Sequence, residues 1–387
     1  MHQNSSRRRF IATGLALPVA GIASTSLPTA LAPAAASAAF QAGGLSYRTL
    51  GKTGVKVTSV GFGCMITSDP SVVEKAADLG ITYFDTARGY QQGNNERMVG
   101  AVLKSRRKNI LIATKSHAAS KEAALGDLDT SLKELGTDYV DIWHLHGKGK
   151  IAEVTDDLID AQQTAKKAGK IRFAGVSTHS GQADLITALV QKGATDVVQA
   201  SYSFTQPPNL TESINAARKA GMGIIAMKVM AGGGGRGRGA AAQPAAKPGS
   251  KLAALKWVLN NPNVDTCVPS MTDMDQLDEN LKAMAQPLTD SDKQLLTAYL
   301  DLVGPRYCRG CLKCEGTCAQ GLPVAEILRY VMYAEDYGQF ALGREHFQQL
   351  PAAMATVRCG DCPSCTVRCP NGVRVLERVS RAQEVLA

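Results

Sequence analysis

The sequence predicts an α/β fold, a (β/α)8 TIM barrel followed by a small cysteine-rich C-terminal domain, and three observations support it. Short apolar runs alternate strictly with segments of helical pattern, eight of each, over roughly 230 residues. Hydrophobic residues make up 44% and charged residues 20% of the 387-residue chain, as in a globular protein. Eight of the ten cysteines follow residue 307.

Segment 45–63 contains two short extended pieces about the turn 51–54, which is a hairpin signal. The eight expected strands are 57–63, 81–87, 109–115, 139–146, 171–177, 196–202, 223–230 and 265–271. The eight expected helices are 71–79, 96–103, 121–135, 153–168, 183–191, 210–220, 252–259 and 275–283. Helices between consecutive strands imply parallel pairing. An open doubly wound sheet is the alternative, but no Gly-x-Gly-x-x-Gly turn follows the first strand.

The first 38 residues are expected to be a twin-arginine signal peptide. Residues 6–11 combine a hydroxyl residue, two arginines, a phenylalanine and an aliphatic residue, and residues 36–38 form a small-x-small cleavage site. The alternative is a disordered basic N-terminus. The leader predicts export of the folded protein to the periplasm or another extracytoplasmic compartment, with no stable membrane anchor. The rest of the chain is expected to form a barrel domain at 45–300 and a second domain at 301–387.

Chemically capable residues stand at the ends of three consecutive expected strands. Asp85, Lys115 and His146 lie at these ends, and Tyr90 lies in the loop after Asp85. The carboxyl ends of barrel strands are where TIM barrels carry their chemistry. Each residue also has an ordinary explanation, as a turn cap, a solvated strand exit or a packing residue. His144 points to the same side of its strand as His146 and is the alternative to it.

Residues 45–284 resemble the aldo-keto reductase family. The resemblance rests on the segments YRTLGKTGVKVTSVGFG, FDTARGY, NERMVG, ILIATK, DYVDIWHLH, GKIRFAGVS and VPSMTDMDQLDEN, in that order. It implies an NAD(P)-dependent oxidoreductase whose catalytic tetrad is Asp85, Tyr90, Lys115 and His146. Tyr90 would protonate the carbonyl oxygen as hydride arrives, and Lys115 would lower the pKa of that phenol. Asp85 would hold Lys115 by an ion pair, and His146 would orient the carbonyl.

The resemblance also implies where the cofactor binds. The nicotinamide would lie against Ser177, Gln199 and the strand end Met227–Lys228. The glycine-rich loop 232–239, with its two arginines at 236 and 238, is expected either to fold over the pyrophosphate or to be a surface loop.

At the adenosine end, the sequence departs from the family pattern. Ser270 and Gln276 stand where the family carries two cations, which weakens the expectation of NADP preference. Glu279 and Asn280, the positions that face the adenine in the family, are retained.

Two cysteine runs share the spacing Cys-x2-Cys-x2-Cys-x3-Cys. They are Cys308, Cys311, Cys314 and Cys318, then Cys359, Cys362, Cys365 and Cys369. This is the ferredoxin pattern for a [4Fe–4S] cluster, with zinc as the alternative metal. In two-cluster ferredoxins the fourth cysteine of each run binds the other cluster, so Cys369 would complete the first set and Cys318 the second. Helices are expected at 324–333 and 374–385, and Cys64 and Cys267 are expected in the core.

The whole chain resembles the subset of aldo-keto reductases with a C-terminal ferredoxin-like extension, which His179 also suits. We therefore expect an exported oxidoreductase that acts on a small carbonyl or alcohol, with two [4Fe–4S] clusters that relay electrons to a redox protein. The alternatives are an electron-transfer or binding protein with a non-catalytic barrel, and clusters that are purely structural. The formal net charge is +9, but no long Lys/Arg run occurs, so nucleic-acid binding has little support.

Overall fold

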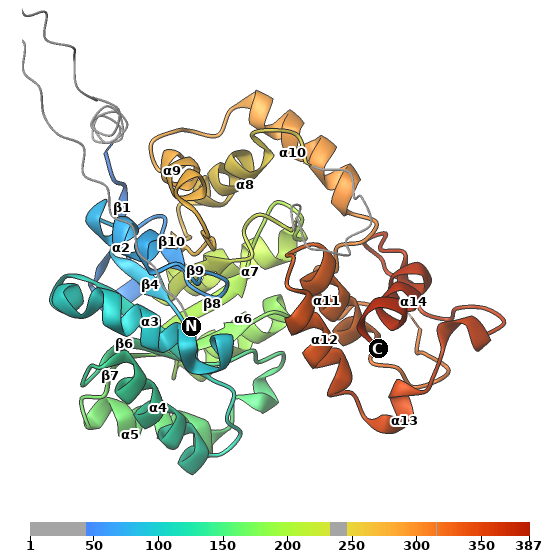
Figure 1. Cartoon of the computed structure of the whole chain (residues 1–387), viewed down its shortest axis with the longest axis horizontal. Coiled ribbons are helices and arrows are strands. Elements are labelled where there is room, and N and C mark those ends of the chain that lie inside the picture. The colour runs from blue at the N-terminus through green and yellow to red at the C-terminus, as the bar shows by residue number, and fades with distance from the viewer. Residues whose placement is uncertain (1–43, 233–245, 315) are drawn as a thin grey trace, which may run out of the picture. The chain divides into compact units, whose positions relative to one another are not determined.

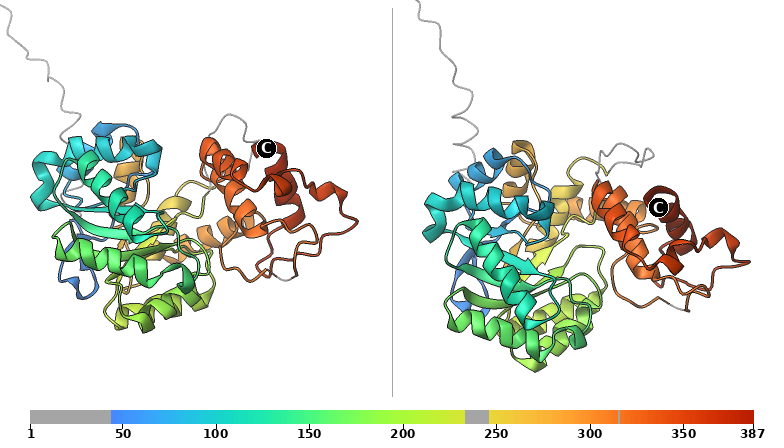
Figure 2. Two further views of the ribbon diagram at one scale, coloured as in Figure 1. Left: turned by 90° about the horizontal axis from the view of Figure 1, so that it is seen from below. Right: turned by 60° about the horizontal axis from the view of Figure 1, so that its bottom comes forward.

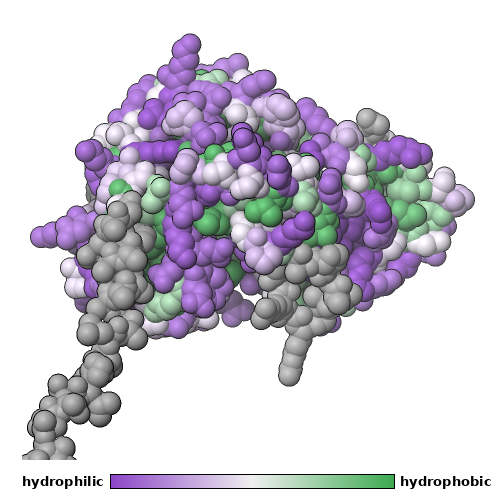
Figure 3. Space-filling model, turned by 90° about the horizontal axis from the view of Figure 1, so that it is seen from above, coloured by the Kyte–Doolittle hydropathy of each residue, from purple (hydrophilic) through white to green (hydrophobic). Residues whose placement is uncertain are grey.

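The structure, a computed structural model, describes residues 44–232, 246–314 and 316–387 (Figure 1). The expected signal peptide at 1–38 and the two arginines at 236 and 238 lie outside these residues. Within the described ranges, no helix is both long and apolar enough to cross a membrane. On the face shown in Figure 3, hydrophilic side chains predominate, and hydrophobic residues lie in groups among them.

Eight parallel strands form the central sheet, and each pairs with the next along the chain. They are β3 (Phe62–Gly63), β4 (Tyr83–Asp85), β5 (Leu111–Ser116), β6 (Val140–Leu145), β7 (Ile171–Thr178), β8 (Val197–Ser201), β9 (Gly223–Met227) and β10 (Thr266–Cys267). Parallel bridges from Val60 to Cys267 and from Gly63 to Ser270 close the sheet on itself. The predicted (β/α)8 barrel is confirmed, so the carboxyl ends of all eight strands meet at one rim.

A helix follows each barrel strand, and the eight helices surround the sheet (Figure 2). They are α2 (Pro70–Asp78), α3 (Asn94–Leu103), α4 (Lys121–Leu135), α5 (Asp156–Lys167), α6 (Gln182–Lys192), α7 (Pro208–Lys219), α8 (Ser250–Leu259) and α9 (Met274–Lys282). Side-chain oxygens of Asp69, Ser120, Thr155 and Asp273 cap four of the helix starts. Every helix predicted in the barrel is present, with its ends shifted by no more than a few residues.

The predicted N-terminal hairpin lies at the end of the barrel opposite the rim formed by the carboxyl ends of the strands. It pairs β1 (Tyr47–Thr49) with β2 (Lys56–Thr58) in antiparallel register. At its turn, the backbone nitrogen of Gly51 donates to Asp265 Oδ2 over 3.1 Å. Gly51 has a φ of +51°, and a Cβ there would lie 2.4 Å from the nitrogen of Gly223, so this close approach requires glycine.

The C-terminal part of the chain is mainly helical. Helix α10 (Asp290–Val303) packs on α8 and crosses the expected domain boundary at residue 300. Four more helices follow: α11 (Val324–Glu335), α12 (Phe340–Gln348), α13 (Ala352–Ala355) and α14 (Val375–Leu386). The expected helices 324–333 and 374–385 are confirmed as α11 and α14, whereas α12 and α13 were not predicted.

Helices α11 and α14 share a hydrophobic core that includes Ile327, Val331 and Val379. Both are amphipathic, and each turns its buried face toward the other. Six of the eight clustered cysteines are partly buried against this core. A small core of its own therefore supports the segment that carries both cysteine runs.

Candidate active site

Asp85 and Lys115 form a buried ion pair at the rim of the barrel. They end the adjacent strands β4 and β5, and their exposed fractions are 4% and 1%. Lys115 Nζ donates to Asp85 Oδ2 over 2.6 Å and to the carbonyl of Thr86 over 2.6 Å. Asp85 Oδ1 is buried and has no hydrogen-bond partner among the described residues. The predicted pairing of these two residues is therefore present in the structure.

Tyr90 and His146 lie beside this pair. The Lys115 ammonium is 5.1 Å from the centre of the Tyr90 ring. The rings of Tyr90 and His146 meet edge to face, with their centres 6.0 Å apart. Tyr90 precedes two residues of positive φ, and the Gln91 side chain secures this turn by donating to the carbonyls of Met65 and Thr67. All four predicted tetrad residues thus converge at one rim of the barrel.

The ionisation of Tyr90 differs from the expectation that Lys115 lowers its pKa. Burial raises the pKa of the Tyr90 phenol well above its usual value, and Asp85 and Tyr333 raise it further. The Lys115 ammonium is directed at Asp85 and the Thr86 carbonyl, and it lies over the Tyr90 ring. The net shift of the Tyr90 pKa is therefore upward rather than downward, because burial dominates, and Tyr90 is a neutral phenol at neutral pH.

His146, rather than His144, is the histidine that contacts Tyr90. The His144 ring is fully buried inside the barrel, where it packs so closely that a Cβ on Gly175 would lie 2.3 Å from its Nδ1. Burial holds the pKa of both histidines well below the usual value. His146 is therefore a neutral imidazole, which can donate one hydrogen bond and accept another.

Two further histidines extend the site. His117, which the sequence analysis did not single out, stacks on His146 with ring centres 3.8 Å apart. Burial, followed by nearby cations, lowers the pKa of His117 to about 4. His179 lies 6.3 Å from His146 between ring centres, and its Nδ1 is 3.3 Å from Ser201 Oγ. The only signal for His117 in the sequence is its place two residues after Lys115.

The residues expected to hold the nicotinamide line the neighbouring strand ends. Ser177 is the last residue but one of β7, Gln199 lies on β8, and Met227 ends β9. Gln199 is 1% exposed, and its Oε1 has no partner among the described residues. Ser177 Oγ accepts from the backbone nitrogen of Gly147 over 2.9 Å. An orphaned buried carboxamide at this rim fits a ligand with its own amide donor.

The adenosine end carries no cation at the positions that the family uses. The Gln276 carboxamide is occupied with its own helix cap, since Nε2 donates to Thr272 Oγ1 over 2.9 Å and to Asp273. Asp273 adds a carboxylate at the start of α9. Asn280 is 2% exposed, and its Nδ2 lacks a partner among the described residues. Ser270 and Glu279 lie nearby in sequence and are half-buried.

The C-terminal helices contribute side chains to the rim that the sequence analysis missed. Lys228, which has a φ of +54°, directs its ammonium at the rings of Tyr333 and Tyr337, 4.6 and 4.9 Å from their centres. Tyr333 belongs to α11 and also acts on the Tyr90 phenol. These contacts span more than a hundred residues of sequence, and no local pattern signals them. The rim is therefore built from both parts of the chain.

Cysteines of the two runs lie near one another. Burial raises the pKa of Cys308 to about 12, and the nearby thiols of Cys314, Cys311 and Cys369 add to this rise. Burial likewise raises the pKa of Cys359 to about 11, with Cys318, Cys365 and Cys362 adding to it. The fourth cysteine of each run thus lies with the first three of the other.

Hydrogen bonds also join the runs. The Asn371 side chain donates to Cys311 Sγ over 3.3 Å and accepts from Arg309 over 2.9 Å. Thr366 Oγ1 donates to the carbonyl of Thr317 over 2.7 Å.

Among the residues that the structure describes, no group of three or more His, Cys, Asp or Glu side chains is arranged to hold a metal ion. Cys64 and Cys267 are fully buried, as expected of core residues.

The first run also touches the barrel. The backbone nitrogen of Gly181, after β7, donates to the carbonyl of Gly310 over 2.8 Å. Gly310 has a φ of +66°, and a Cβ there would lie 2.1 Å from the carbonyl oxygen of His179. The loop between Cys308 and Cys311 is thereby held against the strand end that carries His179.

Comparisons with known proteins agree with this geometry. The chain is 28% identical to L-galactose dehydrogenase of Arabidopsis thaliana over 62% of this chain and 89% of that one. It is 36% identical to an uncharacterized oxidoreductase of Bacillus subtilis, but over only 34% of this chain and 48% of the relative. The structure of an aldo-keto reductase of Bacillus halodurans in its holo form matches 66% of this chain and 96% of that one, with a TM-score of 0.55 and 27% identity.

The sequence model of the Aldo/keto reductase family matches residues 68–252 and 241–301, which together cover more than half of the chain. That match ends where the cysteine-bearing segment begins. The barrel, the residues gathered at its rim and the family match together show that the chain belongs to the aldo/keto reductase family and is an NAD(P)-dependent oxidoreductase.

Proposed function

We propose that the chain transfers hydride between a nicotinamide dinucleotide and a small carbonyl or alcohol, at the rim formed by Asp85, Tyr90, Lys115 and His146. The observation that carries this proposal is the buried ion pair of Lys115 and Asp85, whose ammonium lies 5.1 Å from the centre of the Tyr90 ring. A fixed cation beside a phenol and a neutral imidazole is an arrangement suited to a carbonyl oxygen that gains negative charge.

Each residue has a definite task in the reduction. A bound nicotinamide would supply hydride to the carbonyl carbon, so that the C=O π electron pair would move onto the oxygen. His146 donates a hydrogen bond that orients this oxygen, and the Tyr90 hydroxyl transfers its proton to it. Lys115 stabilises the tyrosinate that remains, since its ammonium is held close to the ring by Asp85. In the oxidation of an alcohol, the same steps run in reverse.

The residues present fit a dinucleotide. Gln199 Oε1 and Asn280 Nδ2 are buried polar atoms without described partners, at the nicotinamide and adenine ends respectively. We propose NAD rather than NADP, because Ser270 and Gln276 bring no cation and Asp273 brings a carboxylate. A carboxylate at this place favours a ribose hydroxyl and repels a 2′-phosphate.

We further propose that the cysteine runs hold two [4Fe–4S] clusters that relay electrons. Cys369 completes the set of Cys308, and Cys318 completes the set of Cys359, as their mutual effects on pKa support. The Cys308 set is the one nearer the barrel, because Gly310 packs against His179. Electrons would pass from a redox protein through the outer set to the inner one. The twin-arginine leader supports export after the clusters are inserted.

Export raises the question of how nicotinamide remains available outside the cytoplasm. We propose that it is bound before export and retained, since α11 lies over the strand end of β9. Two contacts support this cover: Tyr333 lies over Lys228, and a Cβ on Gly232 would lie 2.8 Å from Asp336 Cβ. The retained, oxidised nicotinamide would be reduced again by two electrons, passed one at a time from the redox protein through the clusters, and one proton from solvent.

Anaerobic purification of the exported protein tests both cofactor proposals at once. We expect about eight iron and eight sulfide per chain and one nicotinamide dinucleotide released on denaturation. About four iron would remove the crossed two-cluster assignment. Absence of the dinucleotide would rule out retention, while a reductase that binds nicotinamide from solution would survive.

The second candidate is an electron-transfer protein with a non-catalytic barrel, which the cysteine runs favour, since six of their eight residues pack against one core. Tyr90→Phe separates the two. A reductase is expected to lose about 10²- to 10⁴-fold in kcat. An electron-transfer protein keeps its rate of reduction by dithionite and its transfer of electrons to an acceptor.

A further inference from the structure

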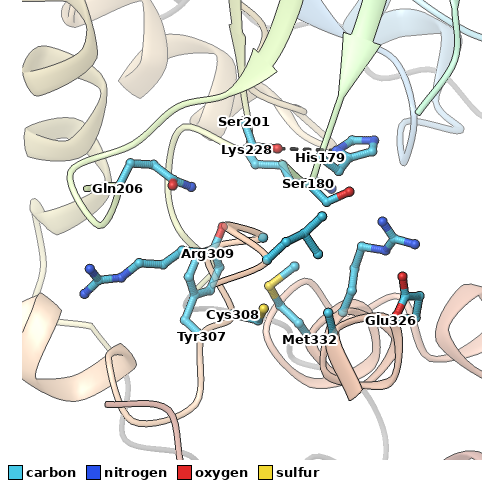
Figure 4. Close-up of a pocket in the computed structure, with 14 residues that line it drawn as sticks. His179, Ser180, Ser201, Gln206, Lys228, Tyr307, Cys308, Arg309, Glu326 and Met332 are labelled. Atoms are coloured by element: carbon cyan, nitrogen blue, oxygen red, sulfur yellow. Dashed lines mark hydrogen bonds between the residues drawn. The ribbon is translucent and has the colours of Figure 1, made fainter. Parts of the chain in front are cut away.

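A pocket lies between the rim of the barrel and the C-terminal segment, beside the proposed catalytic residues (Figure 4). His179, Ser201 and Lys228 reach it from the ends of β7, β8 and β9. Arg309, Glu326 and Arg329 reach it from the cysteine-bearing part of the chain. Figure 4 shows His179 and Ser201 on the side of the strands, with Cys308, Met332 and Glu326 facing them. None of the tetrad residues lines this pocket, so it is a separate compartment of the site.

The pocket gathers positive charge. Lys228, Arg309 and Arg329 line it, and in the described part of the chain none of the three pairs with a carboxylate within 4.0 Å. Lys228 has two aromatic rings as neighbours, and Arg309 donates to the amide oxygen of Asn371. Glu326 is the single carboxylate among the lining residues. Three cations face one anion, which leaves a positive excess in a partly enclosed space.

The charges act together on their neighbours. Burial lowers the pKa of the Lys228 ammonium, and Arg329 lowers it further. Burial also lowers the pKa of His179 well below its usual value, with Lys228 and Arg329 as the next causes. Arg329 thus lies within electrostatic reach of both other groups at the strand ends. Cations that lie close together without anionic partners repel one another, and a bound anion would offset this repulsion.

We propose that the substrate carries a carboxylate or phosphate group, and that Lys228 and Arg329 bind this group while the carbonyl lies at Tyr90 and His146. This inference rests on the proposed reductase function. The anion pocket and the carbonyl site are close together, because the His179 ring lines the pocket and its centre is 6.3 Å from the centre of the His146 ring. A short-chain oxo acid, hydroxy acid or sugar phosphate therefore spans them. Arg329 binds such a group in bidentate fashion, which also fixes the direction in which the substrate enters.

The other source of an anion at this rim is the pyrophosphate of the dinucleotide. The substrate is the better assignment, because two of the three cations come from the cysteine-bearing segment, which lies beyond the family match. The positions that the family uses for the adenosine end lie instead around Ser270 and α9. Arg329 and Arg309 therefore lie in the C-terminal segment that the family model does not match.

Calorimetric titration of the full-length, cluster-loaded protein tests this assignment. The probes are malonate, inorganic phosphate and ADP-ribose, which carries the pyrophosphate of the cofactor without nicotinamide. The test variant is Arg329→Gln, and Arg344→Gln is the matched control, since Arg344 is exposed on α12 and does not line the pocket. We expect malonate or phosphate to bind the unaltered protein and to bind Arg329→Gln about tenfold or more weakly. ADP-ribose should bind both alike, and Arg344→Gln should match the unaltered protein throughout.

Three results would overturn the inference. The first is that neither malonate nor phosphate binds the unaltered protein. The second is that Arg344→Gln weakens their binding as much as Arg329→Gln does. The third is that Arg329→Gln weakens the binding of ADP-ribose as much as that of malonate, which would assign the cations to the cofactor. Binding does not depend on turnover, so these results are distinct from loss of reductase activity in Tyr90→Phe. The visible absorption of the clusters, measured in each variant, verifies that the C-terminal segment is intact.

Discussion

Replacement of Asp85 by asparagine tests the central feature of the site. The change keeps the shape of the side chain but removes the charge that faces Lys115 over 2.6 Å. Lys115 is 1% exposed, so its ammonium would remain buried with only the Thr86 carbonyl and an amide oxygen as partners. The substitution therefore leaves an uncompensated charge inside the barrel.

Removing one partner of a buried ion pair costs about 3–5 kcal/mol of folding stability. We expect Asp85→Asn to lower the folding stability by about 3 kcal/mol, at the lower end of this range, because the asparagine oxygen still accepts a hydrogen bond. The double variant Asp85→Asn/Lys115→Met removes the stranded charge as well. It should be more stable than Asp85→Asn alone, even though both variants lack reductase activity. The coupling between the two positions is the quantity of interest.

Urea unfolding followed by tryptophan fluorescence provides the measurement. The two tryptophans of the chain, Trp143 and Trp257, lie in β6 and α8, so their fluorescence follows the barrel. A loss below about 1 kcal/mol in Asp85→Asn, or a double variant no more stable than the single one, would refute the reasoning. Either result would mean that water reaches Lys115 and that the pair is not the fixed cation that the mechanism needs.

Two further predictions concern pH and cofactor choice. Burial holds the pKa values of His144, His146 and His179 below those of the unfolded chain, so between these values the unfolded state binds more protons. The free energy of unfolding should therefore fall as the pH is lowered from 6.5 to 5.5, by about 1 kcal/mol for each histidine that stays neutral. NADH should bind more tightly than NADPH, and Ser270→Arg should narrow the difference by about tenfold, because it restores a cation at the adenosine end.

The two predictions have separate controls. His144→Gln should reduce the slope of the unfolding free energy against pH by about the contribution of one histidine. An unchanged slope would contradict the neutral, buried state of His144. For the cofactor, fluorescence titration with NADH and NADPH measures both affinities. Preference for NADPH in the unaltered protein would show that cations at positions other than 270 and 276 bind the 2′-phosphate.

The periodicity of the chain was sufficient to predict the barrel. Strands β5, β6, β8 and β9 are buried along their whole length, which is why each appears as a continuous apolar run. Strand ends in such a barrel must meet at one rim, so Asp85 and Lys115 could be paired from sequence position and family pattern alone. Helices α12 and α13 had no comparable signal, because both are short and α12 buries only two of its residues.

The environment of each side chain could not be predicted in the same way. Tyr90 was expected to have a lowered pKa, but burial and the nearness of Asp85 and Tyr333 raise it. His117 could not be assigned to the site from sequence, because its ring stacks on His146 only when β5 and β6 pair in the folded barrel.

What the sequence by itself determined is the order of the strands, the residues at their ends and the spacing of the cysteines, since all three depend on local pattern. Only the tertiary structure decided that α11 carries Tyr333 and Arg329 to the rim. These contacts join segments far apart in the chain. They depend on how whole helices pack, and a local pattern holds no information about which distant surface will cover it.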